Sequence, residues 1–332
     1  MDETPLPIEL SASTRARIRQ MRLVLKPLLH SLALAPAAAY PLYQTVFPRT
    51  PRSSFGGLPL SYAGWGGVPG ASLGDIGDSG RDLVLYLHGG GFFLPVIPLL
   101  HLGFHARLCR DLGAVGFMPD YRLTPQHRYP AALDDCESAY RRALAAGFAA
   151  RRIVLVGESA GGQLVLALLH RLRRLGLPLP AASVIISPVT DLTGLNALPS
   201  RRRNQQADPM VPHSALRAAI DFYSGDADRS HPELSPLYAN FAGFPPLYFL
   251  AADTEIMLDD AVWAARRARA AGVATRLDIW PQLPHAFPLL ARWFPEARQA
   301  RQDIAGFLRQ QLQAPPPQKK TRRRRKLAIW HP

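Results

Sequence analysis

The feature that most constrains this chain is an alternation, from residue 82 onward, of short apolar runs with longer segments of helical periodicity. The apolar runs occupy residues 82–87, 114–118, 153–156, 183–186, 247–251 and 276–280, and the helical patterns occupy residues 98–112, 131–146, 159–175, 258–271 and 295–312. Runs that are apolar throughout are typical of strands buried on both faces of a parallel sheet. This order of elements predicts an α/β fold, with a mostly parallel central sheet flanked by helices.

Composition agrees with a globular protein and excludes several other classes. With 48% hydrophobic and 19% charged residues among 332, the chain can bury a sizeable core and is neither disordered nor collagen-like. Cys109 and Cys136 lack the spacing of metal ligands, so neither a zinc site nor a disulfide framework is expected. The chain opens with acidic residues, and its basic residues continue as far as Lys26, which does not fit a cleavable signal peptide. We therefore expect a cytoplasmic protein.

Half of the formal net charge of +14 comes from one C-terminal segment. Residues 319–326 contain seven basic residues and no acidic one, and they follow a run of three prolines. We predict that residues 315–332 form a solvated, disordered tail, able to contact a membrane or another polyanion through charge alone. No recognised nucleic-acid-binding motif occurs outside this tail, so no specific nucleic-acid partner is expected.

Near the N-terminus, apolar residues recur at steps of three and four beside a basic face. They are Ile18, Met21, Leu25, Leu28 and Leu32. The pattern predicts a helix that kinks or restarts at Pro27 and either packs over a core or rests on a membrane surface. No stretch of the sequence reaches the roughly 18 apolar residues that a membrane-spanning helix needs.

Catalytic groups are expected at the carboxyl ends of the strands, because ligands bind there in parallel α/β sheets. The first candidate is the His-Gly-Gly-Gly sequence at residues 88–91, directly after the run at 82–87. Its backbone N–H groups are not covered by side chains, so they are able to donate hydrogen bonds to a developing negative charge. The alternative interpretation of this segment is a flexible loop.

The second candidate is a Gly-Glu-Ser-Ala-Gly sequence at residues 157–161, between an apolar run and a helical pattern. In a nucleophile elbow, glycines two residues before and after the serine permit a sharp turn from strand to helix. A second match to this pattern, at residues 70–74, has neither an apolar run before it nor a helix after it. We therefore interpret Ser159 as the nucleophile and Ser72 as a loop residue.

A serine nucleophile needs a histidine base and a carboxylate that orients the histidine. Of ten histidines, only His285 lies just beyond the last apolar run, in the loop after the final predicted strand. His101 and His105 are spaced to share one helix face, but no third metal ligand accompanies them. Four acids follow the penultimate run, namely Asp253, Glu255, Asp259 and Asp260, and the last two suit the first turn of the next helix. The order serine, acid, histidine is that of α/β-hydrolases.

Taken together, five sequence blocks resemble the hormone-sensitive-lipase-like branch of the α/β-hydrolase esterases, over about residues 55–312. The blocks are His88-Gly89-Gly90-Gly91-Phe92, residues 120–125 with 129–135, Gly157-Glu158-Ser159-Ala160-Gly161-Gly162, residues 187–192 and residues 280–287. The resemblance implies an oxyanion hole formed by the N–H groups of Gly89, Gly90 and Ala160. It places Glu255 at the position of the acid, with Asp253 as the alternative.

The sequence departs from the family pattern at two places. Glu158 stands where many members have Asp or Thr, and Glu255-Ile256-Met257 stands where many have Asp-Pro-Leu. The resemblance is closer to a subgroup with Glu as the acid.

The resemblance also implies how the chain is divided and what it acts on. An N-terminal segment, residues 1–50, and an insertion after Asp191, about residues 195–225, would form a helical cap over a catalytic domain at residues 51–314. Apolar residues in these segments, among them Leu23, Leu28, Tyr40, Val211 and Phe222, favour a small apolar ester of short-to-medium acyl chain length, or a lactone. No cofactor is expected, because no Gly-x-Gly-x-x-Gly follows a strand and no Walker-type loop occurs. The alternative function is a catalytically silent binding protein with the hydrolase fold.

Overall fold

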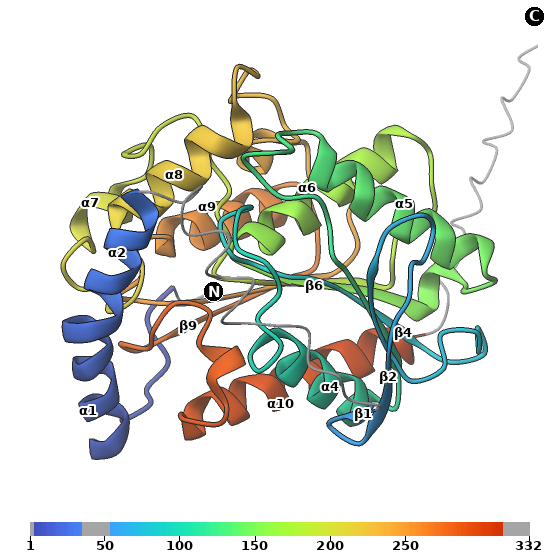
Figure 1. Cartoon of the computed structure of the whole chain (residues 1–332), viewed down its shortest axis with the longest axis horizontal. Helices are drawn as coiled ribbons and strands as arrows, with labels where there is room; N and C mark the ends of the chain where they lie inside the picture. Colours follow the sequence, from blue (N-terminus) through green and yellow to red (C-terminus); the bar gives the residue numbers. More distant parts are fainter. Residues whose placement is uncertain (1–2, 35–53, 315–332) are drawn as a thin grey trace, which may run out of the picture.

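The computed structural model describes residues 3–34 and 54–314. Within these ranges, nine strands form one sheet in the order β1-β2-β3-β5-β4-β6-β7-β8-β9 (Figure 1). The strands are β1 (Ser54–Phe55), β2 (Leu58–Tyr62), β3 (Gly70–Leu73), β4 (Leu83–Leu87), β5 (Val115–Pro119), β6 (Ile153–Glu158), β7 (Ala182–Ile186), β8 (Leu247–Ala252) and β9 (Thr275–Trp280). Strands β4 to β9 are parallel and correspond to the six predicted apolar runs.

Helices cover both faces of this sheet, as the sequence pattern predicted (Figure 1). The helices that follow the strands are α4 (His101–Leu112), α5 (Ala131–Ala145), α6 (Ala160–Arg174), α9 (Leu258–Ala270) and α10 (Pro295–Leu312). Alternate residues of β4 enter two separate cores: Leu83 and Leu85 pack with α5, α6 and α9, whereas Val84 packs with α4 and α10. Because each face of the strand is covered, every position of β4 is buried and apolar.

The prediction that Ser72 is a loop residue is wrong. Ser72 lies in β3, where it is buried and pairs with Phe117 of β5 and with Ser61 of β2 in antiparallel register. The four residues of β3 carry too little apolar pattern to indicate a strand. These residues form a strand because the edge of β5 supplies their hydrogen-bond partners. No helix follows β3, so the contrast with Ser159 still holds.

The N-terminal segment forms a helix with one irregular turn, consisting of α1 (Ala12–Gln20), a π-helical turn (Met21–Leu25) and α2 (Lys26–Leu34). The helix resumes at Lys26, which places Pro27 in the first turn of α2, where its missing N–H costs little. The buried Thr14 donates a hydrogen bond of 3.0 Å to Glu296 of α10. No helix among the described residues is long and apolar enough to cross a membrane.

Two further helices follow β7, namely α7 (Pro199–Arg203) and α8 (His213–Ser224), with short 3-10 turns at Ala150–Arg152, Pro236–Tyr238 and Phe287–Leu290 elsewhere. Helix α2 lies against α8 (Figure 1). His30 contacts Ser214 at 2.7 Å, and the Lys26 ammonium donates to the carbonyls of Gln205 and Asp208 at 2.6 and 2.8 Å. The rest of the predicted cap segment, including Tyr40, and the predicted tail at residues 315–332 lie outside the described residues.

Candidate active site

Ser159 occupies a sharp turn between β6 and α6. Its backbone has φ 56° and ψ −121°, a conformation that side-chain-bearing residues rarely adopt. The two flanking glycines are required by close packing: a Cβ at Gly157 would collide with the carbonyl of Gly161, and one at Gly161 would collide with the carbonyl of Leu87. The half-buried Ser159 side chain is thereby raised at the carboxyl end of the sheet, as the elbow pattern predicts.

His285 and Glu255 form a hydrogen-bonded pair. His285 lies in the loop after β9, Glu255 lies in the turn after β8, and the His285 Nδ1 to Glu255 Oε2 distance is 2.7 Å. Both side chains are buried. The other oxygen of Glu255 accepts hydrogen bonds from the Ser187 hydroxyl at 2.8 Å and from the Ala252 N–H at 2.7 Å. With these donors in place, the carboxylate is held toward the imidazole ring.

The pKa values of both partners are raised, but for different reasons. Burial raises the pKa of Glu255, and the hydrogen bond from His285 only partly opposes this. Burial by itself would lower the pKa of His285, but the hydrogen bond and the charge of Glu255 outweigh it, and the net pKa is raised.

The other three candidate acids have different partners. The Asp253 carboxylate accepts a 2.6 Å hydrogen bond from the Gln282 N–H, and Asp259 accepts one of 2.7 Å from the Ser200 N–H. Asp260 pairs with Arg201 at 2.7 Å, with both side chains fully buried. Of the four acids, Glu255 is the one bonded to His285.

Asp260 lies in the first turn of α9, as expected, but its contacts extend beyond that helix. Its carboxylate also accepts hydrogen bonds from the N–H and the hydroxyl of Thr190, so it joins α9 to the segment after β7 as well as to α7. Breaking a buried ion pair costs about 3–5 kcal/mol, compared with under about 1 kcal/mol for a charge at a helix start. The sequence shows the position of Asp260 on the helix but not the cation that faces it.

The glycine loop, residues 88–97, lies against the turn at Ser159. The backbone N–H of one of its predicted oxyanion-hole residues already has a hydrogen-bond acceptor. The Gly89 N–H donates to the buried carboxyl of Glu158. A Cβ on Gly89 would lie 3.1 Å from the Cβ of Ser159, so the loop passes directly beside the serine. This hydrogen bond conflicts with the expectation that Gly89 contributes to an oxyanion hole. Gly90 and Ala160 remain from the predicted set, and the next N–H in the loop is that of Gly91.

Ser187 is a site residue whose contacts the sequence analysis missed. It follows β7, has φ 46°, donates to Glu255 and accepts from the Ala286 N–H at 3.2 Å. The preceding residue, Ile186, accepts a 2.9 Å hydrogen bond from the Ser159 N–H. Ser187 therefore joins the acid and histidine turns beside the elbow. Its position directly after an apolar run is the signal that could have identified it.

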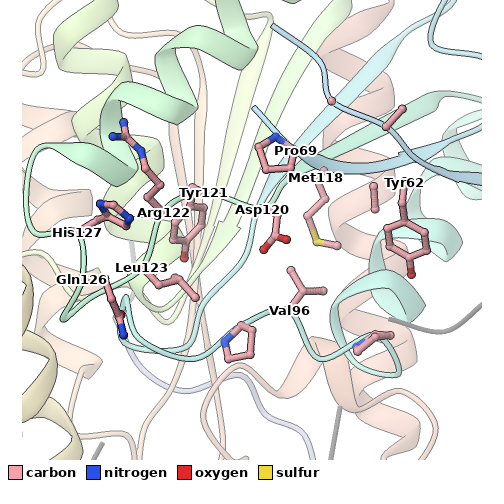
Figure 2. A pocket seen from close by; sticks show the side chains of 16 residues that line it. Tyr62, Pro69, Val96, Met118, Asp120, Tyr121, Arg122, Leu123, Gln126 and His127 are labelled. Atoms are coloured by element: carbon pink, nitrogen blue, oxygen red, sulfur yellow. The ribbon is translucent and has the colours of Figure 1, made fainter. Parts of the chain in front are cut away.

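Figure 2 shows a pocket of about 670 Å³ that has no lining residue from the proposed triad. Tyr62, Val96, Met118 and Asp120 are among its lining residues, whereas Ser159 is not. Tyr121 also lines the pocket and donates a 2.6 Å hydrogen bond to the carbonyl of His88. Within the described parts of the chain, no group of three or more His, Cys, Asp or Glu residues is arranged to hold a metal ion.

The fold and the residues at the strand ends define an α/β-hydrolase, and comparisons with known proteins agree. The chain belongs to the α/β-hydrolase fold family, whose sequence model matches residues 84–289, and within that family to the hormone-sensitive-lipase-like esterases.

Among its relatives, an esterase of Acinetobacter venetianus is 33% identical over 83% of this chain and 89% of its own length. An acetyl-hydrolase of Streptomyces hygroscopicus is 35% identical over 69% and 76%. The crystal structure of an esterase from the bacterial hormone-sensitive lipase family superposes with a TM-score of 0.78 at 34% identity, covering 92% of this chain and all of the other. The protein is a carboxylic ester hydrolase.

Proposed function

We propose that the protein is a serine esterase that hydrolyses small carboxylic esters through an acyl-enzyme intermediate, with Ser159, Glu255 and His285 as its catalytic triad. The observation that carries this proposal is the buried His285–Glu255 hydrogen bond beside an elbow serine. A base oriented by a carboxylate, next to a serine on a strained turn, is the arrangement that acyl transfer requires.

In the proposed mechanism, His285 takes the proton of the Ser159 hydroxyl as the oxygen attacks the ester carbonyl. Glu255 accepts the Nδ1–H of His285, which leaves Nε2 free to receive that proton. His285 then gives the proton to the leaving alcohol, and water repeats the sequence to release the acid. The carboxylate stabilises the imidazolium that forms in each step.

The negative charge on the carbonyl oxygen is stabilised by backbone N–H groups. Ala160 is the first residue of α6, so its N–H has no helical acceptor and lies at the positive end of the helix dipole. Gly90 supplies a second N–H in the loop beside Ser159. Removing one such donor typically lowers kcat by about 10²–10³-fold.

We propose that residues 1–50 and about 195–225 act as a cap over this site. In support, the Phe92 ring of the glycine loop stacks on Tyr223 of α8, with ring centroids 3.7 Å apart. Helix α2 lies against α8 in turn. An apolar cap that contacts the glycine loop suits an apolar ester substrate of short-to-medium acyl length, or a lactone. The acetyl-hydrolase named above supports the short end of this range.

A panel of nitrophenyl esters tests the substrate class. We expect kcat/KM to be highest among acetyl, butyryl and octanoyl esters and at least about tenfold lower for the palmitoyl ester, because the cap limits the acyl length. A simple lactone belongs in the same panel. Equal or higher activity on the palmitoyl ester would contradict the chain-length proposal, and hydrolysis of none of these substrates would contradict the esterase itself.

The raised pKa of His285 predicts a pH profile. Only neutral imidazole accepts the serine proton, so activity is lost below this pKa and gained above it. Because the net pKa is raised, the midpoint of kcat/KM against pH should lie above the usual histidine value of about 6.5. Initial rates between about pH 5 and 9 with an activated ester measure this midpoint. A flat profile would argue against His285 as the base.

A further inference from the structure

Glu158, the residue before Ser159, is a buried carboxyl that the proposed mechanism does not use. It is the last residue of β6 and is 2% exposed. Its Oε2 accepts a hydrogen bond from the Tyr86 hydroxyl, and its Oε1 accepts one from the Gly89 N–H. The Nε2 atom of His101 lies 3.3 Å from the same Oε1. Three different segments therefore meet at one carboxyl beside the nucleophile.

His101 extends this contact to the far end of the glycine loop. Its Nδ1 accepts a 2.8 Å hydrogen bond from the Ile97 N–H, so the ring proton resides on Nε2 and faces Glu158. Burial, with a smaller contribution from nearby His88, lowers the pKa of His101 well below its usual value and keeps the ring neutral. Residues 88–97 are therefore bonded to Glu158 at both ends, directly at Gly89 and through His101 at Ile97.

The protonation of Glu158 suits a position beside an oxyanion. Burial raises its pKa to about 8, against the hydrogen bonds from Tyr86 and Gly89, so the carboxyl is largely neutral near pH 7. With the proton on Oε2, Oε1 remains the acceptor for the Gly89 N–H. The neutral carboxyl holds the loop without placing a full negative charge next to the one that develops in the reaction.

We propose that Glu158 is a positioning residue that fixes the oxyanion loop at the nucleophile, by accepting the Gly89 N–H and, through His101, the far end of the loop. Because Glu158 adjoins Ser159 in the chain, the serine and the loop that faces it are held by one hydrogen-bond network. This inference rests on the proposed esterase function. It assigns Glu158 no contact with the substrate.

Two substitutions at Glu158 distinguish the effect of losing the hydrogen-bond acceptor from the effect of changing the side-chain volume. Glu158→Leu preserves much of the volume but leaves the Gly89 N–H without its acceptor. We expect kcat to fall by about 10²-fold with little change in KM, because misplaced oxyanion donors weaken transition-state binding alone. Glu158→Gln should keep kcat within about threefold, because its amide oxygen accepts from Gly89 and its NH₂ donates to the Tyr86 oxygen.

The measurement is kcat per active site, with the sites counted by organophosphate titration so that unfolded molecules do not contribute. Asp278→Leu is the matched control: Asp278 is also a buried carboxyl that accepts a tyrosine hydroxyl, from Tyr248 at 2.6 Å, but it has no bond to the glycine loop. This variant should lower stability and leave kcat per site unchanged. His101→Leu independently tests the contact that joins Glu158 to Ile97 through His101, and this variant should lower kcat by about tenfold.

Several outcomes would overturn the proposal. Normal kcat per site in Glu158→Leu would show that the loop needs no such anchor, as would equal impairment of Glu158→Gln and Glu158→Leu. If Glu158→Leu does not fold, normal kcat per site in His101→Leu refutes the network. Failure of the esterase function itself would be recognised differently, because the unmodified protein would then show neither ester hydrolysis nor titratable sites.

Discussion

Replacing Ser159 with alanine is expected to abolish both ester hydrolysis and covalent labelling by an organophosphate. The hydroxyl is the group that forms the acyl-enzyme intermediate, and removing a triad serine lowers kcat by about 10⁶-fold. The side chain is half-buried and loses a single oxygen, so the variant should remain folded. Nitrophenyl acetate hydrolysis and mass-spectrometric detection of the adduct measure the two losses.

Ser72→Ala is the matched control, because Ser72 lies in the same Gly-x-Ser-x-Gly pattern. Its Oγ is buried in β3 and has no hydrogen-bond partner within residues 3–34 and 54–314. The alanine variant should keep full activity and full labelling, since nothing in the site depends on that hydroxyl. Equal loss in both variants would mean that the strand-to-helix context does not distinguish the nucleophile.

Glu255→Gln is expected to leave a folded protein with very little activity. The amide cannot stabilise the imidazolium as a carboxylate does, and its NH₂ can face His285 Nδ1, which favours the wrong tautomer. An analogous substitution of a triad acid lowers kcat by about 10⁴-fold. The loss of Glu255 also removes the largest cause that raises the pKa of His285, so burial should lower that pKa. Steady-state kinetics together with circular dichroism separate lost chemistry from lost folding.

The other three acids serve as controls for this result. Asp253→Asn should stay active, because an amide oxygen can still accept the Gln282 N–H. Asp259→Asn and Asp260→Asn should also stay active, but the second should unfold more easily because Arg201 loses its buried partner. If Asp253→Asn were inactive and Glu255→Gln active, the acid would be Asp253 and the reaction class would be unchanged.

The parallel half of the sheet was predictable because burial on both faces leaves a clear mark on the sequence. Each of the six predicted strands agrees with β4 to β9 to within two residues at either end. Strands β1 to β3 were missed because they are short and because they join the parallel sheet through the pairing of β3 with β5, which is distant in the sequence. Gly70, for example, packs so closely on Phe117 of β5 that a Cβ there would lie 2.5 Å from the ring.

The candidate site was predictable to a similar degree. Ser159 and His285 follow from where they stand relative to apolar runs, and Glu255 followed only from a family resemblance. The expectation for Gly89 conflicts with the structure because sequence reveals an N–H group but not its acceptor. Asp260 illustrates the same limit, since nothing near it in the sequence indicates a buried arginine.

The sequence by itself determined the order of the parallel strands and their helices and the chemical groups at the strand ends, because local periodicity and backbone sterics act over a few neighbouring residues. Only the tertiary structure decided which of four closely spaced acids meets His285 and which loop N–H is already engaged. Those outcomes depend on contacts between distant segments: Ser187 after β7 bonds the carboxylate of Glu255, and Asn204 at the end of α7 bonds the carbonyl of Glu255 at 2.8 Å. Packing between distant segments sets the direction of the Glu255 side chain, and no local sequence pattern encodes that direction.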